Sequence, residues 1–225
     1  MKIYVIGKPV KHSMSPIIHN YWLKKYSKSH VYEKKEVCKD SLKKIIEQIK
    51  TKKIVGVNVT IPYKKDFYNL LENLSSNAKK SKAVNTLYLK NDNVYGENTD
   101  GIGYCEALKQ EMNYEVKGKN ILVLGSGGAS FGIISELINR KASKIIVSNR
   151  TKIRCHQLIE NFKNNKTKLD KMEWQKIEPS REIDLIINTT SIGMKENEQI
   201  DINTKNLEKK TIYSCLLYTS PSPRD

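Results

Sequence analysis

The spacing of apolar residues changes repeatedly along the chain, and each change predicts a new element of secondary structure. Stripes at i, i+3, i+4 and i+7 predict helices over Ser41–Thr51 and Ala129–Arg140. Around these stripes lie short apolar runs typical of buried strands: Ile3–Ile6, Val31–Val37, Ile54–Val59, Val84–Leu89, Ile121–Leu124, Ile145–Ser148 and Leu185–Asn188. The alternation of strands and helices predicts an α/β fold with mostly parallel sheets.

The same order of elements indicates two halves. The first ends at about residue 101, and a helix from Thr99 to about Asn113 leads into the second, residues 102–214. Within the first half, the turn-forming residues of Lys90–Asn93 predict a hairpin. The final segment, residues 215–225, contains no Lys, Asn or Ile, although the rest of the chain is rich in all three. We therefore expect this segment to be a non-native tail that follows a truncation.

The composition is sufficient for a packed core, and the high net positive charge bears on which partners the protein could bind. Of the 225 residues, 38% are hydrophobic, and no apolar run approaches the ~18 residues of a membrane helix. The formal net charge of +16 would suit nucleic acid or an acidic membrane surface. However, 35 of the 40 basic residues are Lys and they are scattered, whereas phosphate and base readers favour Arg. We therefore expect neither nucleic acid nor a membrane as the partner.

Cysteine and histidine usage excludes two further kinds of site. The four Cys residues form no C-x-x-C pair, and the four His residues show no metal-ligand spacing. A disulfide framework and a metal site are therefore both disfavoured. Free thiols fit a reducing compartment, so we expect a cytoplasmic protein that holds no metal.

A glycine-rich turn opens the second half and predicts a dinucleotide site. It follows the apolar strand Ile121–Leu124 and precedes an amphipathic helix, as in the G-x-G-x-x-G fingerprint. Glycines let the backbone approach a pyrophosphate, while the helix N-terminus offers free N–H groups. The third glycine of the fingerprint is Ser130 here, and a glycine-rich turn without a ligand remains the alternative. The candidate cofactor residues in this turn are Gly125, Ser126, Gly127, Gly128 and Ala129.

The residues after the next strand indicate which dinucleotide would bind. NAD enzymes usually place an Asp or Glu there to hold the ribose 2′-OH, but this chain has Asn149, Arg150 and Thr151. Arg150, with Lys152 and Arg154 nearby, would favour a 2′-phosphate through charge-assisted hydrogen bonds. The sequence therefore predicts NADP, with an exposed basic turn as the alternative.

Four compact polar clusters lie at strand ends or in the following loops of the first half, where α/β sites are built. They are His12–Pro16, Asn58–Lys64, Ala83–Thr86 and Asn98–Asp100. Ser13 and Ser15 could hydrogen-bond a carboxylate beside the start of a helix, or one of them could cap that helix. Lys64 could donate and accept a proton beside Asp100, or it could be one of many solvated lysines.

In this order, the clusters resemble the shikimate dehydrogenase family. The resemblance covers about residues 1–214 and is carried by these motifs: Tyr4–Gly7, His12–Pro16, Gly56–Lys64, Ala83–Thr86, Asn98–Gly101, Gly125–Ser130, Asn149–Thr151 and Asn188–Met194. It implies an N-terminal α/β substrate-binding domain, residues 1–101, followed by a Rossmann-like NADP-binding domain, residues 102–214. It also implies a cytoplasmic enzyme of aromatic amino-acid and chorismate biosynthesis that acts as a monomer or homodimer.

The resemblance implies roles for particular residues in the NADP-dependent interconversion of 3-dehydroshikimate and shikimate. Ser13 and Ser15 would bind the substrate carboxylate, and Lys64 with Asp100 would carry out proton transfer. Ring hydroxyls would be held by Thr60, Asn85 and Asp100. NADP would be bound by Gly125, Ser126, Gly127, Gly128, Ala129, Asn149, Arg150, Thr151 and Arg154, with Met194 in the loop at its nicotinamide end.

The chain departs from the family pattern near its end. The family continues with a helix that bears a substrate-binding Gln, and no such helix follows Ile212–Ser214 here. Two alternatives therefore stay open beside the leading interpretation. One is a quinate/shikimate dehydrogenase relative with broader substrate or NAD use, and the other is a non-catalytic NADP-binding remnant.

Overall fold

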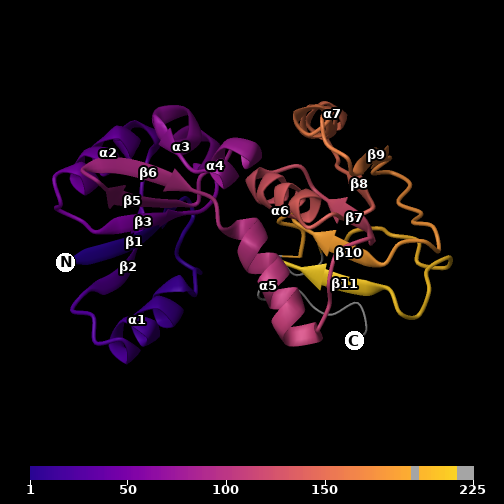
Figure 1. Cartoon of the computed structure of the whole chain (residues 1–225), viewed down its shortest axis with the longest axis horizontal. Coiled ribbons are helices and arrows are strands. Elements are labelled where there is room, and N and C mark those ends of the chain that lie inside the picture. Colours follow the sequence, from indigo (N-terminus) through magenta and orange to yellow (C-terminus); the bar gives the residue numbers. More distant parts are fainter. Residues whose placement is uncertain (194–197, 217–225) are drawn as a thin grey trace. The chain divides into compact units, whose positions relative to one another are not determined.

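The computed structural model describes residues 1–193 and 198–216 (Figure 1). It contains two compact units, Met1–Asp100 and Gly101–Asp225. Met194 and most of the predicted tail, residues 217–225, lie outside the described residues. Cys215, the first residue of that tail, lies in the last strand of the second unit.

The first unit is built on a six-stranded mixed sheet of order β2-β1-β3-β5-β6-β4 (Figure 1). Its strands are β1 (Lys2–Gly7), β2 (Val31–Glu36), β3 (Gly56–Val59), β4 (Asn73–Leu74), β5 (Thr86–Lys90) and β6 (Asn93–Glu97). Three pairings are parallel and two, β3–β5 and β5–β6, are antiparallel. The predicted hairpin is confirmed: Asn91 and Asp92, with φ of 49° and 56°, form the left-handed turn between β5 and β6.

Helices cover the two faces of this sheet unequally. They are α1 (Ser15–Lys25), α2 (Leu42–Lys50), α3 (Lys64–Leu70) and α4 (Ser76–Ser81), with a 3₁₀ turn at Lys39–Ser41. The predicted α2 stripe is buried through Leu42, Ile45 and Ile49, in one cluster with α3, α4 and one face of the sheet. On the other face, the buried cluster holds Val5, Val10 and Tyr32, and α1 contributes only the partly buried Leu23.

The direction of each strand brings the polar clusters to one edge of the sheet. β1, β3 and β6 all end at that edge, whereas antiparallel β5 begins there. Residues just after β1, β3 and β6 and those around the start of β5 therefore meet, although they are far apart in sequence. This edge carries the candidate substrate residues.

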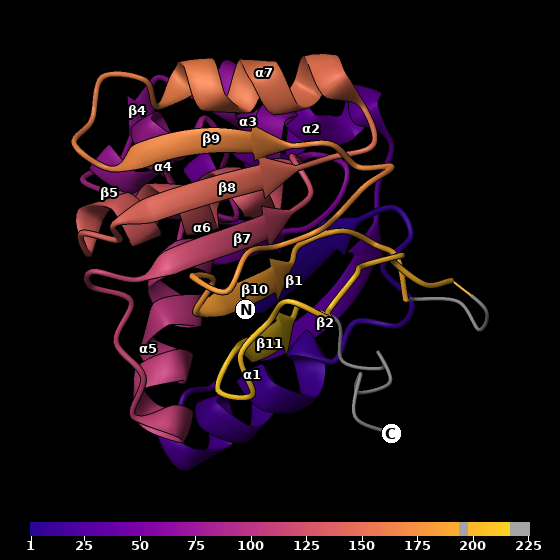
Figure 2. The same ribbon diagram turned by 90° about the vertical axis from the view of Figure 1, so that its right-hand side faces the viewer.

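The second unit is an all-parallel five-stranded sheet of order β11-β10-β7-β8-β9, and its arrows all point the same way in Figure 2. The strands are β7 (Asn120–Leu124), β8 (Lys144–Ser148), β9 (Lys168–Met172), β10 (Leu185–Asn188) and β11 (Ile212–Cys215). The helices are α5 (Asp100–Met112), α6 (Gly128–Asn139) and α7 (Lys152–Asn161). This fold agrees with the predicted α/β class and with a Rossmann-like unit.

Alternation along β7 separates two cores. Ile121 and Val123 pack with buried residues of α5, α6 and α7, whereas Leu122 and Leu124 pack in a second cluster on the other face. That second cluster is closed by side chains that lie outside the strands: Trp174, Ile177, Ile183, Ile200, Ile202 and Leu207. In the described ranges, no helix is long and apolar enough to cross a membrane.

Candidate functional site

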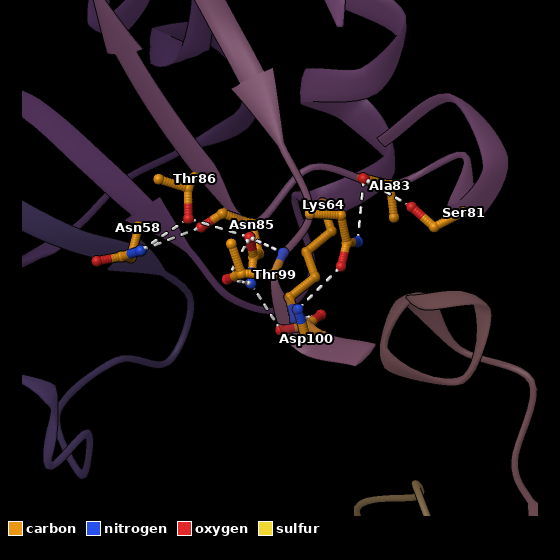
Figure 3. A network of polar contacts seen from close by, with 9 residues as sticks. Asn58, Lys64, Ser81, Ala83, Asn85, Thr86, Thr99 and Asp100 are labelled. Carbon is orange, nitrogen blue, oxygen red and sulfur yellow. Dashed lines mark hydrogen bonds and ion pairs between the residues drawn. The ribbon is translucent and has the colours of Figure 1, made fainter. Parts of the chain in front are cut away.

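Lys64 and Asp100 form an ion pair at the polar edge of the first unit (Figure 3). Lys64 is the first residue of α3, just after β3, and Asp100 follows β6 and opens α5. Lys64 Nζ lies 2.5 Å from Asp100 Oδ2, and the two side chains are only 14% and 21% exposed. A charge-assisted hydrogen bond partly shielded from water holds the ammonium in one place.

Asn85 fixes the other side of the Asp100 carboxylate (Figure 3). Its Nδ2 donates to Asp100 Oδ1 at 2.7 Å and to Thr99 Oγ1 at 3.0 Å. Its Oδ1 accepts the N–H of Thr99 at 3.0 Å. Both oxygens of Asp100 are therefore engaged, and the carboxylate cannot rotate without breaking a hydrogen bond.

Backbone and Asn98 contacts lock these loops to one another. The N–H of Val84 donates to the carbonyl of Lys64 at 2.9 Å, so the start of α3 is tied to the segment before β5. Asn98 is 3% exposed, donates to the carbonyl of Ala83 and accepts the N–H of Asp100 at 3.1 Å. Asn98 belongs to a predicted motif but was not among the candidate site residues. Its burial and its hydrogen bonds indicate that it holds the two loops together.

Ser13 and Ser15 lie together at the start of α1. The Ser13 hydroxyl donates to the Ser15 hydroxyl at 3.1 Å and accepts the N–H of Ser15 at 3.3 Å. The residue in the N-cap position is Met14, so neither serine occupies it. The one contact that resembles helix capping is therefore the hydrogen bond from the Ser15 N–H to the Ser13 hydroxyl.

Tyr32 and Asn58 extend the hydrogen-bonded network of the site toward β2, and neither residue was predicted as a site residue from the sequence. Tyr32 Oη donates to Asn58 Oδ1 at 2.7 Å, and Asn58 Nδ2 donates to Thr86 Oγ1 at 3.0 Å. Asn58 belongs to one of the predicted polar clusters. A polar residue inside the short apolar strand β3 is the sequence signal that could have marked it as a site residue. Tyr32 lies in a predicted strand, with no local signal of this contact.

Thr60 follows β3 and packs closely against Gly7 at the end of β1. A Cβ at position 7 would collide with the methyl group of Thr60 and would lie 2.8 Å from the carbonyl oxygen of Ile61. The backbones are joined there because the N–H of Lys8 donates to that carbonyl at 3.0 Å. Only glycine at position 7 permits this approach, which sets where Thr60 lies.

The glycine-rich turn between β7 and α6 leaves an open surface at a helix N-terminus. Gly125 has φ of +112°, a backbone conformation that favours glycine, and a Cβ there would lie 2.6 Å from Thr189 Oγ1. Gly127 precedes α6, and a Cβ on it would meet nothing within 4 Å. Ser126 Oγ is buried without a hydrogen-bond partner among the described residues. An open backbone surface and an unpartnered hydroxyl fit a pyrophosphate at this helix N-terminus.

Ser130, which replaces the third glycine of the fingerprint, is fully buried and fully hydrogen-bonded. Its hydroxyl accepts the N–H of Gly127 at 3.1 Å and lies 2.7 Å from Thr189 Oγ1. The Thr189 hydroxyl in turn donates to the carbonyl of Leu124 at 2.7 Å. The serine therefore joins the turn after β7 to the loop after β10, and its polar group is compensated.

Exposed basic residues follow β8. The Asn149 side chain donates to the carbonyl of Thr151 at 2.9 Å, and Arg150, Thr151 and Arg154 are exposed. Lys152 pairs with Glu173 at 3.0 Å, whereas neither arginine has an ion pair within the described part of the chain. Two uncompensated guanidinium groups fit a 2′-phosphate. Among residues 1–193 and 198–216, no group of His, Cys, Asp or Glu side chains could hold a metal ion.

Comparisons with known proteins agree with this geometry. Residues 5–87 match the family described as the shikimate dehydrogenase substrate binding domain, and residues 106–212 match shikimate / quinate 5-dehydrogenase. A shikimate dehydrogenase (NADP(+)) of Pelagibacter ubique is 38% identical over 218 residues, which are 96% of this chain and 79% of that protein.

Solved structures show the same relationship. The shikimate dehydrogenase of Aquifex aeolicus has a TM-score of 0.83 at 36% identity, covering 97% of this chain and 79% of that one. The shikimate 5-dehydrogenase of Thermus thermophilus, in complex with NADP(H) and shikimate, has a TM-score of 0.84 at 29% identity with the same coverage. On the strength of both sequence and structure, this chain belongs to the shikimate dehydrogenase family.

Proposed function

We propose that this chain catalyses the NADP-dependent interconversion of 3-dehydroshikimate and shikimate, a step of aromatic amino-acid biosynthesis. The observation that carries the proposal is the shielded pair of Lys64 and Asp100, with Asn85 on the second carboxylate oxygen. Reduction of a ketone needs one proton donor at a fixed place beside the new alkoxide, and this ammonium is such a donor.

The substrate residues are assigned by motif and supported by their place at one edge of the sheet. Ser13 and Ser15 offer two hydroxyls to the substrate carboxylate beside the start of α1. Thr60, Asn85 and Asp100 hold the ring hydroxyls. Asp100 then has two roles, since the same carboxylate orients the substrate and the Lys64 ammonium.

The cofactor residues are those of the turn Gly125–Ala129 and those after β8. The open surface at Gly127 would receive the pyrophosphate, and Arg150 with Arg154 would pair with the 2′-phosphate; Asn149 and Thr151 shape that turn. Met194, which lies outside the described residues, is assigned to the nicotinamide end by its motif alone. When bound, NADP supplies or accepts the hydride.

The protein's own contribution is proton transfer and orientation. Lys64 donates a proton to the oxygen of the developing alkoxide during reduction and removes it during oxidation. Asp100 stabilises the ammonium before transfer and keeps Nζ aimed at one point. Such positioned proton transfer is typically worth ~10²–10⁴-fold in rate.

Organisation and setting complete the proposal. Residues 1–101 form the substrate-binding and catalytic domain, and residues 102–214 the NADP-binding domain. Strand β11 of that domain runs on to Cys215, so this first residue of the expected tail, 215–225, belongs to the fold. The enzyme acts as a monomer or homodimer in the cytoplasm, without a nucleic-acid partner. All four cysteines are free thiols, which fits a reducing compartment.

The test is shikimate-dependent formation of NADPH by the purified chain, followed by near-ultraviolet absorbance. We expect turnover that depends on both shikimate and NADP, with quinate and NAD as poorer replacements. NADP binding without turnover on either substrate would contradict the proposal and would favour the non-catalytic remnant. Faster turnover of quinate than of shikimate would favour the broader relative.

A further inference from the structure

The phenol of Tyr32 begins a hydrogen-bonded chain that crosses the first sheet to the proposed proton donor. We propose that Tyr32 and Thr86 are positioning residues that orient the side-chain amides of Asn58 and Asn85, and through them Asp100. The inference rests on the proposed function, because it concerns how that site is held for its substrate. No motif of the sequence includes Tyr32.

Two consecutive residues of α1, His19 and Asn20, hold Tyr32 in place. Asn20 of α1 hydrogen-bonds both the N–H and the carbonyl of Tyr32, at 2.9 and 2.8 Å. The ring of His19, one position earlier on α1, stacks on the Tyr32 ring with centroids 4.3 Å apart and planes 6° apart. Tyr32 is only 2% exposed. These contacts therefore hold the phenol oxygen in one position beside β3.

The phenol has a single proton, and its contacts show where that proton goes. Burial raises the pKa of Tyr32 above its ordinary range, while hydrogen bonding with Ser15 lowers it by less, so the phenol stays protonated at neutral pH. Its O–H then donates to Asn58 Oδ1 at 2.7 Å. Ser15, a proposed carboxylate ligand, thus adjoins the same phenol oxygen.

Each donor in the chain sets the orientation of the next group. Because the phenol donates to Asn58 Oδ1, the Asn58 amide must turn its Nδ2 toward Thr86 Oγ1, 3.0 Å away. The Thr86 hydroxyl, having accepted that bond, donates its own proton to Asn85 Oδ1 at 3.0 Å.

The last link reaches the acid of the proposed catalytic pair. With its Oδ1 engaged by Thr86, Asn85 presents Nδ2 to Asp100 Oδ1 at 2.7 Å. A flipped Asn85 would instead bring two oxygens together. Thr99 N–H also donates to Asn85 Oδ1 at 3.0 Å. Loss of the hydrogen bond from Thr86 would therefore leave the Asn85 amide less firmly oriented but still bonded. We therefore expect a graded loss of substrate affinity.

The sheet explains why these residues meet. Along β3 and β5, Val57, Val59 and Leu87 face the core formed with α2 and α3. Asn58 and Thr86, at alternate positions, therefore point to the face that α1 covers, where Tyr32 also lies. The chain of hydrogen bonds runs across this face from β2 over β1 to β3 and β5.

The test compares hydroxyl-deleting variants with a conservative one. Tyr32→Phe keeps the ring that stacks on His19, and Thr86→Val keeps the shape of the side chain. Each removes one link, so we expect the KM for shikimate to rise about 3- to 10-fold, the worth of one hydrogen bond. The KM for NADP should stay within about twofold. Thr86→Ser retains the hydroxyl and should restore the wild-type KM.

Tyr63→Phe is the matched control for lost stability. It also deletes a buried phenol hydroxyl, which donates to the carbonyl of Val37 at 2.9 Å and takes no part in the hydrogen-bonded chain from Tyr32 to Asp100. We expect its unfolding midpoint in urea to fall about as far as that of Tyr32→Phe, with an unchanged KM for shikimate. An equal rise of KM in Tyr63→Phe or in Thr86→Ser would overturn the inference, because loss of stability would then explain the effect.

Failure of the inference and failure of the proposed function give different results. An active wild type with unchanged KM in Tyr32→Phe and Thr86→Val would overturn the positioning role alone. A wild type that neither turns over nor binds shikimate would overturn the proposed function. The hydrogen-bonded chain would then be tested by a double-mutant cycle of Tyr32→Phe and Thr86→Val, measured as the free energy of unfolding. Linked residues give non-additive changes in the free energy of unfolding, whereas strictly additive changes would overturn the chain of contacts as well.

Discussion

The substrate edge of the first unit and the dinucleotide turn of the second are built in opposite ways. At the substrate edge, side chains satisfy one another: both Asp100 oxygens and both ends of the Asn85 amide are engaged. At the dinucleotide turn, the surface is backbone and is left open at Gly127, with the Ser126 hydroxyl unpartnered among the described residues.

The difference follows from what each region is proposed to hold. A small ring with several hydroxyls is recognised by fixed side chains, and orienting these beforehand lowers the cost of binding. A pyrophosphate is recognised by N–H groups and a helix N-terminus, which need open space rather than side chains. Substitutions should therefore act at the first region through lost groups and at the second through added bulk.

The largest expected effect comes from removing the proton donor. Lys64→Ala should lower the rate of shikimate oxidation by ~10²–10⁴-fold, since positioned proton transfer is lost. The KM for NADP should change little, because Lys64 belongs to the substrate edge. Initial rates of NADPH formation measure both. Exposed Lys79 on α4 supplies the control, and Lys79→Ala should keep wild-type rates. A loss of less than threefold in Lys64→Ala would contradict the assigned role.

Next in size is the change expected at the basic turn after β8. Arg150→Ala should raise the KM for NADP by about 10- to 100-fold, the range of a charge-assisted hydrogen bond, and leave the KM for NAD nearly unchanged. Measuring both coenzymes separates the 2′-phosphate from the rest of the cofactor. Arg181→Ala removes an exposed arginine elsewhere and serves as the control for net charge. Equal losses with NADP and NAD would refute the assignment.

Two glycines of the same turn allow bulk to be separated from strain. Gly125→Ala places a side chain at φ of +112° and against Thr189, so it should lower the free energy of unfolding by about 1–3 kcal/mol. Gly127→Ala meets no neighbour, so unfolding should change by less than ~0.5 kcal/mol while NADP binding weakens. Urea unfolding and NADP titration test the pair. Unweakened NADP binding in Gly127→Ala would show that the open surface is not used.

The smallest effect concerns pH and the first unit alone. Burial lowers the pKa of His19, so the folded state favours the neutral ring and the unfolded state binds the proton more readily. This contribution to stability is complete above about pH 6.5, the ordinary histidine pKa, and is lost as pH falls below it. His19→Phe preserves stacking on Tyr32 without titrating. Urea unfolding at pH 5 and pH 8 should show a smaller pH dependence for this variant than for wild type.

Much of the fold could be predicted from local pattern, and the exceptions have physical causes. The stripe of α2 and the apolar strands of the second sheet were found because their burial repeats at a fixed period. Strand β9 was missed because it lies at the sheet edge, where Lys168, Asp170 and Lys171 face water and dilute the apolar signal. The seven-residue α3 is too short to show a stripe.

The site could be predicted as a set of motifs but not as a geometry. Lys64 and Asp100 are 36 positions apart, and their contact depends on antiparallel β5 entering between two strands that point the other way. Tyr32 was invisible because its partner, Asn58, is two strands away in the sheet. Local sequence records which groups are available, whereas strand order decides which of them meet.

The close approach of Gly7 to Thr60 has a consequence for how such sequences diverge. Any side chain at position 7 would collide with the Thr60 methyl, so position 7 is not free to vary. Serine at position 60 would remove the methyl but would leave the Ile61 carbonyl oxygen 2.8 Å from a Cβ at position 7, so we expect descendants of this sequence to keep glycine at position 7 whether position 60 is threonine or serine. Evolution at the end of β1 is thus constrained by the segment that follows β3.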